Sequence, residues 1–295
     1  MADLELRTFL GDEGVALVAD CYGASDRGTV LLAHGGGQTR HAWAKTGTSL
    51  AAAGWRAVAL DLRGHGDSAR SPTGDYRMER FAADLVAVAA QLGDKPAVVG
   101  ASLGGIAGMV VETLVAPETF SSLTLVDITP RMNPAGVAKI MGFMSEHVES
   151  GFASLEEAAD VIARYLPNRA RSKDLTGLSK NLRQDADGRY RWRWDPLFVT
   201  SVMHGRDGRS MDSFAASVSS LRIPVHLIRG RMSELVSQDD VQEFLTLVPH
   251  AKFTDVENAG HMVAGDKNDV FVEAVLAFLD RPGPELPVGG RRVAV

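Results

Sequence analysis

The sequence predicts an α/β fold, in which helices flank a mostly parallel central sheet and a helical cap is inserted into the core. Three observations predict it. Short apolar runs alternate with helix-length segments, this alternation lapses between residues 130 and 221 before it resumes, and 295 residues suffice for one domain with an insertion. We therefore expect the core at 1–129 and 222–281, the cap at 130–221 and a flexible tail at 282–295.

The first part of the core is expected to begin with a hairpin at the sheet edge. Residues 4–9 and 15–22 are strand-like, and a turn containing two glycines joins them. Buried parallel strands are expected next, because short runs of Val, Leu, Ile and Ala follow one another with helix-length spacing. These runs lie at 30–33, 57–60, 97–99 and 123–126, and the helical segments include 80–92 and 104–115.

The second part of the core repeats this order. A strand is expected at 223–228, a helix at 239–248, a strand at 252–256 and a closing helix at 269–279. The intervening cap has helical stretches and no strongly strand-like run. Its large apolar side chains are expected to form a ceiling over a substrate pocket; the candidates are Met141, Met144, Trp192 and Trp194.

A Gly-x-Ser-x-Gly pattern stands where an expected strand meets an expected helix. It consists of Gly100, Ser102 and Gly104 with Ala101 and Leu103 between them. A serine on so tight a strand-to-helix turn lies in strained backbone, and the residues two before and two after it must lack bulk. The following helix directs its first amides toward charge that develops on the serine oxygen. Ser102 is therefore the candidate nucleophile.

Glycines also follow the expected strand at 30–33, in the run His34-Gly35-Gly36-Gly37. Such a run lets bare backbone approach a substrate oxygen. We expect the amides of Gly36 and Leu103 to form an oxyanion hole, in which fixed donors stabilise developing negative charge. His34 itself is expected to hold the loop, as is His65 in the charged motif at 61–68, because both histidines precede the serine in the chain.

His261 is the candidate general base, since it comes directly after the last expected strand and imidazole exchanges protons near neutral pH. An acid is needed to orient it, and this acid must lie between Ser102 and His261 in the chain and at a strand end. Two residues qualify. Glu234 follows the strand at 223–228 and is the preferred candidate; Asp127 ends the strand at 123–126 and is the alternative.

Together, the motifs His34-Gly35-Gly36, 61–68, 100–104 and Gly260-His261 resemble the α/β-hydrolase superfamily over nearly the whole chain. The chain is similar to the capped branch, which includes esterases, lactonases, carbon–carbon hydrolases and cofactor-free haloperoxidases. Epoxide hydrolases and haloalkane dehalogenases of this superfamily carry aspartate at the elbow, so the serine disfavours those activities.

This resemblance implies a catalytic triad of Ser102, His261 and an acid, an oxyanion hole and a cap that shapes substrate choice. The expected activity is hydrolysis of small or medium carboxylic esters or lactones through an acyl-serine intermediate. Carbon–carbon bond hydrolysis and perhydrolysis are alternatives with the same triad. A small-ligand receptor without catalysis is the alternative from another class.

Composition limits the partners. The net charge of −6 is spread without a basic stripe, so neither nucleic acid nor an anionic membrane surface is an expected partner. Cys21 is the only cysteine, which excludes an intramolecular disulfide and a cysteine-based metal cluster. The N-terminus lacks a signal-peptide pattern and no apolar stretch is long enough to cross a bilayer. We expect a cytoplasmic enzyme without metal or cofactor, acting on a small molecule as a monomer or homodimer.

Overall fold

The computed structural model describes residues 4–166, 171, 174–204 and 211–280, and the expected tail at 282–295 lies outside them. Its centre is an eight-stranded sheet in the order β1-β2-β4-β3-β5-β6-β9-β10. The strands are β1 Leu4–Leu10, β2 Ala16–Tyr22, β3 Thr29–Ala33, β4 Arg56–Leu60, β5 Ala97–Ala101, β6 Ser122–Val126, β9 Val225–Gly230 and β10 Lys252–Val256. The strands from β4 to β10 run parallel, and β2 is antiparallel to both β1 and β4. The expected mostly parallel sheet with an edge hairpin is therefore confirmed.

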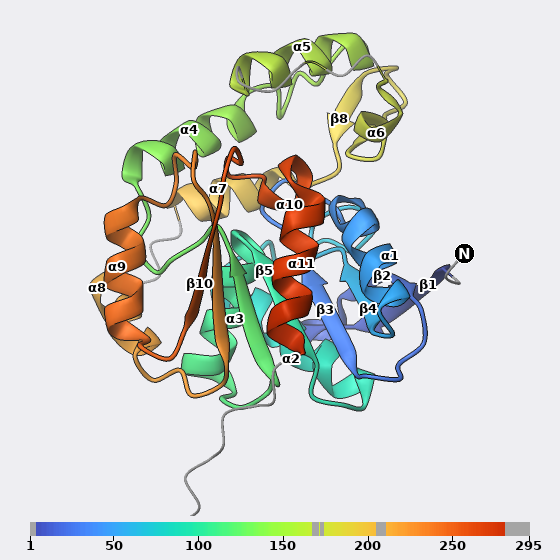
Figure 1. Ribbon diagram of the computed structural model, residues 1–295. Helices are drawn as coiled ribbons and strands as arrows, with labels where there is room; N and C mark the ends of the chain where they lie inside the picture. Colours follow the sequence, from blue (N-terminus) through green and yellow to red (C-terminus); the bar gives the residue numbers. More distant parts are fainter. Residues whose placement is uncertain (1–3, 167–170, 172–173, 205–210, 281–295) are drawn as a thin grey trace, which may run out of the picture.

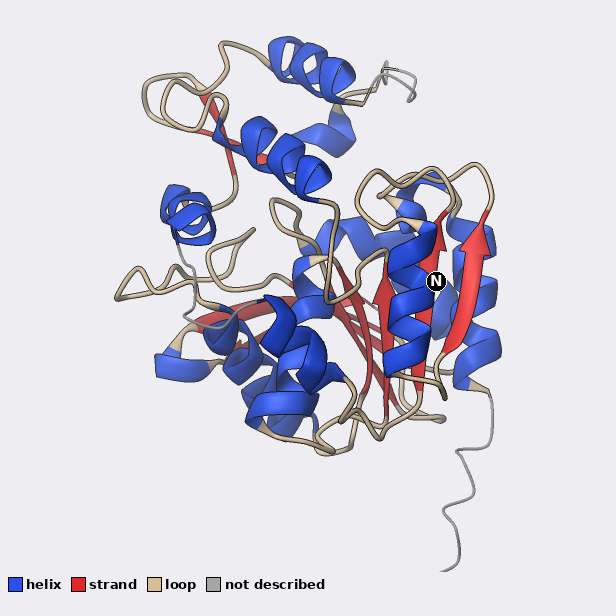
Figure 2. Ribbon diagram, turned by 90° about the vertical axis from the view of Figure 1, so that its left-hand side faces the viewer, coloured by secondary structure: helices blue, strands red, loops and turns tan. Residues whose placement is uncertain are grey.

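Helices cover both faces of this twisted sheet (Figure 2). They are α1 Ala44–Ala52, α10 Val263–Asp266 and α11 Asn268–Leu279 on one face, and α2 Met78–Leu92, α3 Leu103–Val110, α8 Met211–Val218 and α9 Gln238–Leu247 on the other. Each face has its own apolar core. Trp43 stacks on Phe271 in one core, while Phe81 and Phe244 are fully buried in the other. Burial on both faces explains why the parallel strands are continuously apolar.

Above the carboxyl ends of the strands lies the segment that the sequence sets apart as a cap (Figure 1). It contains α4 Pro134–Ser145, α5 Leu155–Tyr165, α6 Thr176–Ser179 and α7 Pro196–His204, together with the antiparallel pair β7 Leu182–Gln184 and β8 Tyr190–Trp192. This hairpin was not expected, because three residues per strand are too few to show a period-two pattern. The expected cap range at 130–221 also includes α8, which packs against α9 on the core.

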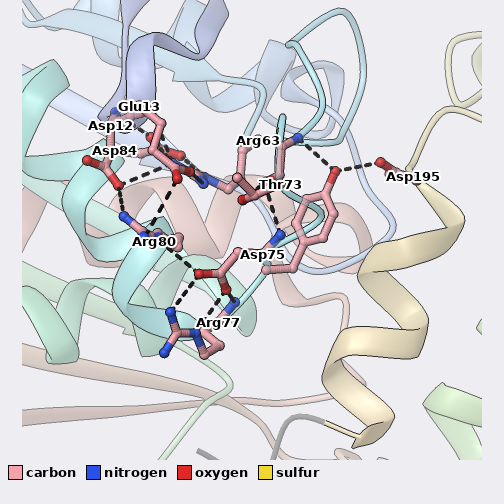
Figure 3. Close-up of polar contacts among 11 residues, drawn as sticks. Asp12, Glu13, Arg63, Thr73, Asp75, Arg77, Arg80, Asp84 and Asp195 are labelled. Atoms are coloured by element: carbon pink, nitrogen blue, oxygen red, sulfur yellow. Dashed lines mark hydrogen bonds and ion pairs between the residues drawn. The ribbon is translucent and has the colours of Figure 1, made fainter.

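The cap is joined to the core by backbone and side-chain hydrogen bonds. The amide of Asp195 donates to the carbonyl of Gly64 at 2.7 Å, and the amide of Gly66 donates to the carbonyl of Arg193 at 2.7 Å. The Tyr76 hydroxyl donates to the Asp195 carboxylate at 2.7 Å; the dashed line that ends at Asp195 in Figure 3 marks this bond. These contacts fix the start of α7 against the loop that follows β4.

A buried arginine anchors that loop in turn (Figure 3). Arg63 is fully buried, and its guanidinium binds the Asp84 carboxylate of α2 through two hydrogen bonds of 2.6 and 2.8 Å. Glu13 accepts a further bond at 3.2 Å. A buried guanidinium needs such paired carboxylates, because an unpaired charge in the interior is costly. Through Arg63, the motif at 61–68 is therefore tied to α2 and to the turn between β1 and β2.

None of the helices that the structure describes is both long and apolar enough to span a bilayer.

Candidate active site

Ser102 occupies the tight turn between β5 and α3 with φ 45° and ψ −109°, a conformation that costs free energy for a residue with a side chain. The flanking glycines make the turn possible. A Cβ on Gly100 would lie 2.6 Å from the backbone of Gly104, and one on Gly104 would lie 2.5 Å from the carbonyl oxygen of Ala33. Both distances are too short for any side chain. The turn thus presents Ser102 at the carboxyl end of the sheet.

His261 lies in the loop between β10 and α10, and its side chain is 26% exposed. Its Nδ1 is 2.7 Å from Oδ2 of Asp127. A carboxylate at this nitrogen accepts the Nδ1–H proton and leaves Nε2 free to accept another one. The histidine and the carboxylate come from residues 134 apart in the chain, and the parallel sheet brings them to the same edge.

Asp127 is fully buried directly after β6, with φ 50°. Besides the His261 contact, its carboxylate accepts hydrogen bonds from the amide of Gly230 at 2.9 Å and the hydroxyl of Ser233 at 2.5 Å. Its own amide donates to the carbonyl of Ile228 at 2.7 Å. Donors from the end of β9 therefore hold the carboxylate in position and stabilise its charge in a buried place.

The acid next to His261 is consequently the alternative candidate and not the preferred one. The Glu234 side chain is 63% exposed, and its carboxylate binds the Lys139 ammonium of α4 at 2.5 Å. The structure thus brings Asp127, and not Glu234, to His261, and the physical reason lies in the direction of the side chains. Both acids follow strands whose ends meet, but the Glu234 side chain turns outward to the cap, whereas Ser233, one residue earlier, turns inward to Asp127.

Two backbone amides near Ser102 are open donors. In the glycine loop after β3, the amide of Gly35 donates to the side chain of Gln38 at 3.0 Å and that of Gly37 donates to Nε2 of His65 at 3.1 Å. Among the residues that the structure describes, no acceptor is assigned to the amides of Gly36 and Leu103. One of these amides, that of Leu103, directly follows Ser102, and the other, that of Gly36, belongs to the glycine loop after β3.

His34 and His65 are fully buried loop-holding groups. Nε2 of His34 accepts the amide of Leu62 at 3.0 Å, and its Nδ1 donates to the carbonyl of Gly35 at 2.8 Å. Nδ1 of His65 donates to the carbonyl of Arg63 at 3.0 Å. Burial lowers the pKa of His34 to about 4 and, helped by the neighbouring His34, that of His65 to about 3. Both rings are therefore neutral at pH 7.

Acidification is expected to destabilise the fold through these two histidines. The folded pKa values of His34 and His65 lie below the value of about 6.5 in an unfolded chain, so the unfolded state takes up protons first. The free energy of unfolding therefore decreases as the pH falls below about 6.5. At pH 4.5 we expect a decrease of about 2 to 3 kcal/mol for each ring. Urea unfolding at pH 7 and pH 4.5 measures the loss.

The control for this prediction is the double variant His34→Gln/His65→Gln, which has no titrating ring at either position. Its free energy of unfolding should fall less between the two pH values than that of the wild type. An equal fall in both proteins would contradict the assignment of the pH dependence to these rings.

Two of the four cap residues singled out from the sequence lie beside the glycine loop. A Cβ placed on Gly37 would be 3.1 Å from Cε of Met144 and 3.2 Å from Cζ3 of Trp194. Trp192 stacks on Trp194 with ring centroids 4.7 Å apart and packs against other cap aromatics. Met141 is partly buried against the same apolar cluster. Met144 and Trp194 are thus the two that adjoin the site.

Sequence reasoning missed two residues that contact the site loops. Phe198 of α7 would be 3.3 Å from a Cβ on Gly36, and its ring meets His65 edge-on at 4.7 Å. Gln38 links the glycine loop to the His261 loop, because its amide donates to the sulfur of Met262 at 2.9 Å. The position of Gln38 three residues after Gly35 is a local signal that was available. Phe198 stands in no motif, so only the fold reveals it.

Within the described parts of the chain, no group of three or more His, Cys, Asp or Glu side chains is placed to hold a metal ion. At the carboxyl edge of the sheet the structure places the Ser102 turn and the carboxylate–imidazole pair of Asp127 and His261.

Comparisons with known proteins agree with this arrangement. A family model described as "alpha/beta hydrolase fold" matches residues 28–267. Esterase Rv0045c of Mycobacterium tuberculosis is 30% identical over 260 residues, which are 85% of this chain and 82% of that protein. A solved structure of that esterase superposes with a TM-score of 0.74 and 27% identity, and covers 95% of this chain and 93% of its own. The mouse sn-1-specific diacylglycerol lipase ABHD11 is 29% identical over 77% of this chain and 72% of its own length. The chain therefore belongs to the α/β-hydrolase family.

Proposed function

We propose that this protein is a serine hydrolase of carboxylic esters, with Ser102 as nucleophile, His261 as general base and acid, and Asp127 as the orienting carboxylate. The observation that carries the proposal is the hydrogen bond of 2.7 Å between His261 and the buried Asp127, at the same sheet edge as the strained Ser102 turn. Relatives named as esterases and a lipase support the same chemistry.

In the acylation step, Oγ of Ser102 attacks the ester carbonyl carbon while Nε2 of His261 takes the hydroxyl proton. The negative charge that develops on the carbonyl oxygen is stabilised by the amides of Gly36 and Leu103. The carbon–oxygen bond to the alcohol then breaks, and His261 returns the proton to the leaving alkoxide. Asp127 holds the imidazole in one tautomer throughout and stabilises the imidazolium without taking the proton.

Deacylation repeats these steps with water. His261 removes a proton from a water molecule, the hydroxide attacks the acyl carbon, and the bond to Oγ of Ser102 breaks as the serine regains its proton. The carboxylic acid leaves, and the enzyme returns to its starting state. Acylation and deacylation together consume one ester and one water molecule and release one alcohol and one carboxylic acid, with no change of oxidation state.

The segment above the site is proposed to act as the cap that selects substrates. Met144, Trp194 and Phe198 bring apolar surface to the glycine loop, which suits an acyl or alcohol group without charge. We therefore assign small or medium esters and lactones as the substrate class. The comparisons do not favour carbon–carbon hydrolysis, perhydrolysis or a receptor role.

The cytoplasm is the proposed location. Cys21 is a free cysteine and is buried, with 3% of its surface exposed. Burial also raises the pKa of its thiol, so the thiol stays protonated. Both the burial and the protonation protect it from oxidation. A chain with one buried thiol suits a reducing compartment.

Burst-resolved hydrolysis of p-nitrophenyl esters from acetate to decanoate tests the proposal. An acyl-serine intermediate that forms faster than it breaks down releases about one p-nitrophenol per enzyme before the steady state. The chain length at which kcat/KM falls then gives the size of the acyl pocket. Multiple turnover on at least one ester is expected; a folded protein that hydrolyses no ester in the series contradicts the proposal.

A further inference from the structure

The outer edge of the sheet at β1 carries exposed leucines. β1 is the terminal strand of the sheet (Figure 1). Leu4, Leu6 and Leu10 are 61%, 64% and 62% exposed. Because alternate residues of a strand share a face, these leucines and Thr8 lie on the same side of the sheet. An exposed apolar edge strand is a template for pairing with another strand.

The backbone of β1 shows which of its polar groups point outward. The amide of Gly11 donates to the carbonyl of Val15, which continues β2. Because backbone groups of a strand alternate in direction, the N–H and C=O groups of the other odd-numbered residues of β1 also point toward β2. The even-numbered residues therefore turn their N–H and C=O groups away from β2. Leu10 agrees, because both of its backbone groups bind the side-chain amide of Gln91, at 3.1 and 2.7 Å.

The side chain of Gln91 therefore occupies the outward backbone groups of Leu10, so a further strand cannot pair with β1 at this residue. Three residues of β1 remain with outward N–H and C=O groups that are assigned no partner in the described chain: Leu4, Leu6 and Thr8. Their centre is Leu6. A second strand that pairs with all three residues and stops before Leu10 is centred on Leu6. The registers shifted by one residue are centred on Glu5 and on Arg7.

Charge selects the register when the second strand is another copy of β1. In an antiparallel pair centred on Leu6, Leu6 faces Leu6 of the second copy, Leu4 faces Thr8, and Glu5 faces Arg7. A pair centred on Glu5 sets two glutamates directly opposite each other, and one centred on Arg7 sets two arginines opposite. Of these three registers, only the one centred on Leu6 joins opposite charges without placing two like charges opposite each other.

We propose that the protein forms a twofold homodimer through antiparallel pairing of β1 with β1 of a second copy, centred on Leu6. The pairing joins the two sheets into one continuous sheet and satisfies the outward groups of Leu4, Leu6 and Thr8 in each copy. It sets Leu6 beside Leu6 and Leu4 beside Thr8 of the second copy and makes two Glu5–Arg7 ion pairs. The active sites at the carboxyl ends of the strands stay complete within each chain.

Sedimentation velocity over micromolar to near-millimolar concentrations tests the dimer. A species of twice the chain mass is expected, and Arg7→Glu is expected to shift it to single-chain mass, because two glutamates then face each other across the pair. The charge-swapped variant Glu5→Arg/Arg7→Glu should restore the dimer. A wild-type protein that stays at single-chain mass throughout the range overturns the proposal.

Disulfide trapping tests the register separately. In a Cys21→Ala background, Glu5→Cys and Arg7→Cys are prepared as two proteins. The pair Glu5–Arg7 belongs to the non-hydrogen-bonded class, in which Cα atoms lie about 4.5 Å apart, a distance that a disulfide spans. The mixture should oxidise to a covalent dimer, and neither protein alone should do so. Covalent dimers of Glu5→Cys alone, or of Arg7→Cys alone, would overturn the Leu6 register.

Both experiments use ester hydrolysis as a check that each variant is folded. Equal activity per chain is expected in all of them, since Glu5 and Arg7 lie at the far edge of the sheet from Ser102.

Discussion

Replacement of Ser102 by alanine is expected to lower kcat for ester hydrolysis by about 10⁴- to 10⁶-fold, because the variant has no hydroxyl to form the acyl intermediate. The residual rate comes from the open amides and from binding of the substrate. Alanine fits the turn at φ 45° as serine does, so the melting temperature should stay within a few degrees of the wild-type value. Stopped-flow measurement with p-nitrophenyl esters shows the loss of both burst and turnover.

The matched control for Ser102→Ala is Ser219→Ala, which removes an exposed hydroxyl that binds only the nearby carbonyl of Ala216 in the described structure. Its turnover should equal that of the wild type. Substantial burst kinetics in Ser102→Ala would remove Ser102 from the mechanism while leaving the fold unaffected.

Replacement of Asp127 by asparagine is expected to lower kcat by about 10⁴-fold. The amide of asparagine presents a donor to Nδ1 of His261, so the ring adopts the tautomer with its proton on Nε2 and can no longer accept the serine proton. KM should change much less than kcat, because Asp127 is fully buried and does not touch substrate in the proposed mechanism. Michaelis–Menten kinetics at pH 7 to 8 separate the two parameters.

Glu234→Gln is the matched control, as it makes the same chemical change in the other candidate acid. Its carboxylate is 63% exposed and pairs with Lys139, and an exposed pair of this kind contributes little free energy. Turnover should remain within about twofold of the wild type. A large loss in Glu234→Gln with a small one in Asp127→Asn would reverse the assignment made from the geometry.

The order of the core strands along the chain could be predicted because it depends on local patterns. Continuous apolar runs mark strands that are buried on both faces, and the helical segments between them mark the crossovers. The Ser102 turn is equally local, since only glycine tolerates the contacts at 100 and 104. The boundaries of the core strands differ from the expected ones by at most two residues, as in β5, which extends to Ala101 and so reaches the serine.

The cap was harder to predict because its elements are short and pack on non-local partners. The β7–β8 hairpin has three residues in each strand, and its Trp192 is fixed by stacking on Trp194 and by contacts with Phe143 and Phe152. The placement of α8 on the core likewise depends on its packing against α9, which follows later in the chain, after β9. Local propensity carries no information about such partners.

The sequence by itself determined the family-level fold, the serine at its turn and the histidine after the last strand, because each follows from short-range steric or hydrophobic demands. Only the tertiary structure decided which acid meets His261. Glu234 and Asp127 both follow parallel strands that end at the same edge, and sequence position does not separate them. Long-range donors do: Gly230 and Ser233 from the end of β9 stabilise a buried charge on Asp127, while Lys139 of the cap holds Glu234 at the surface.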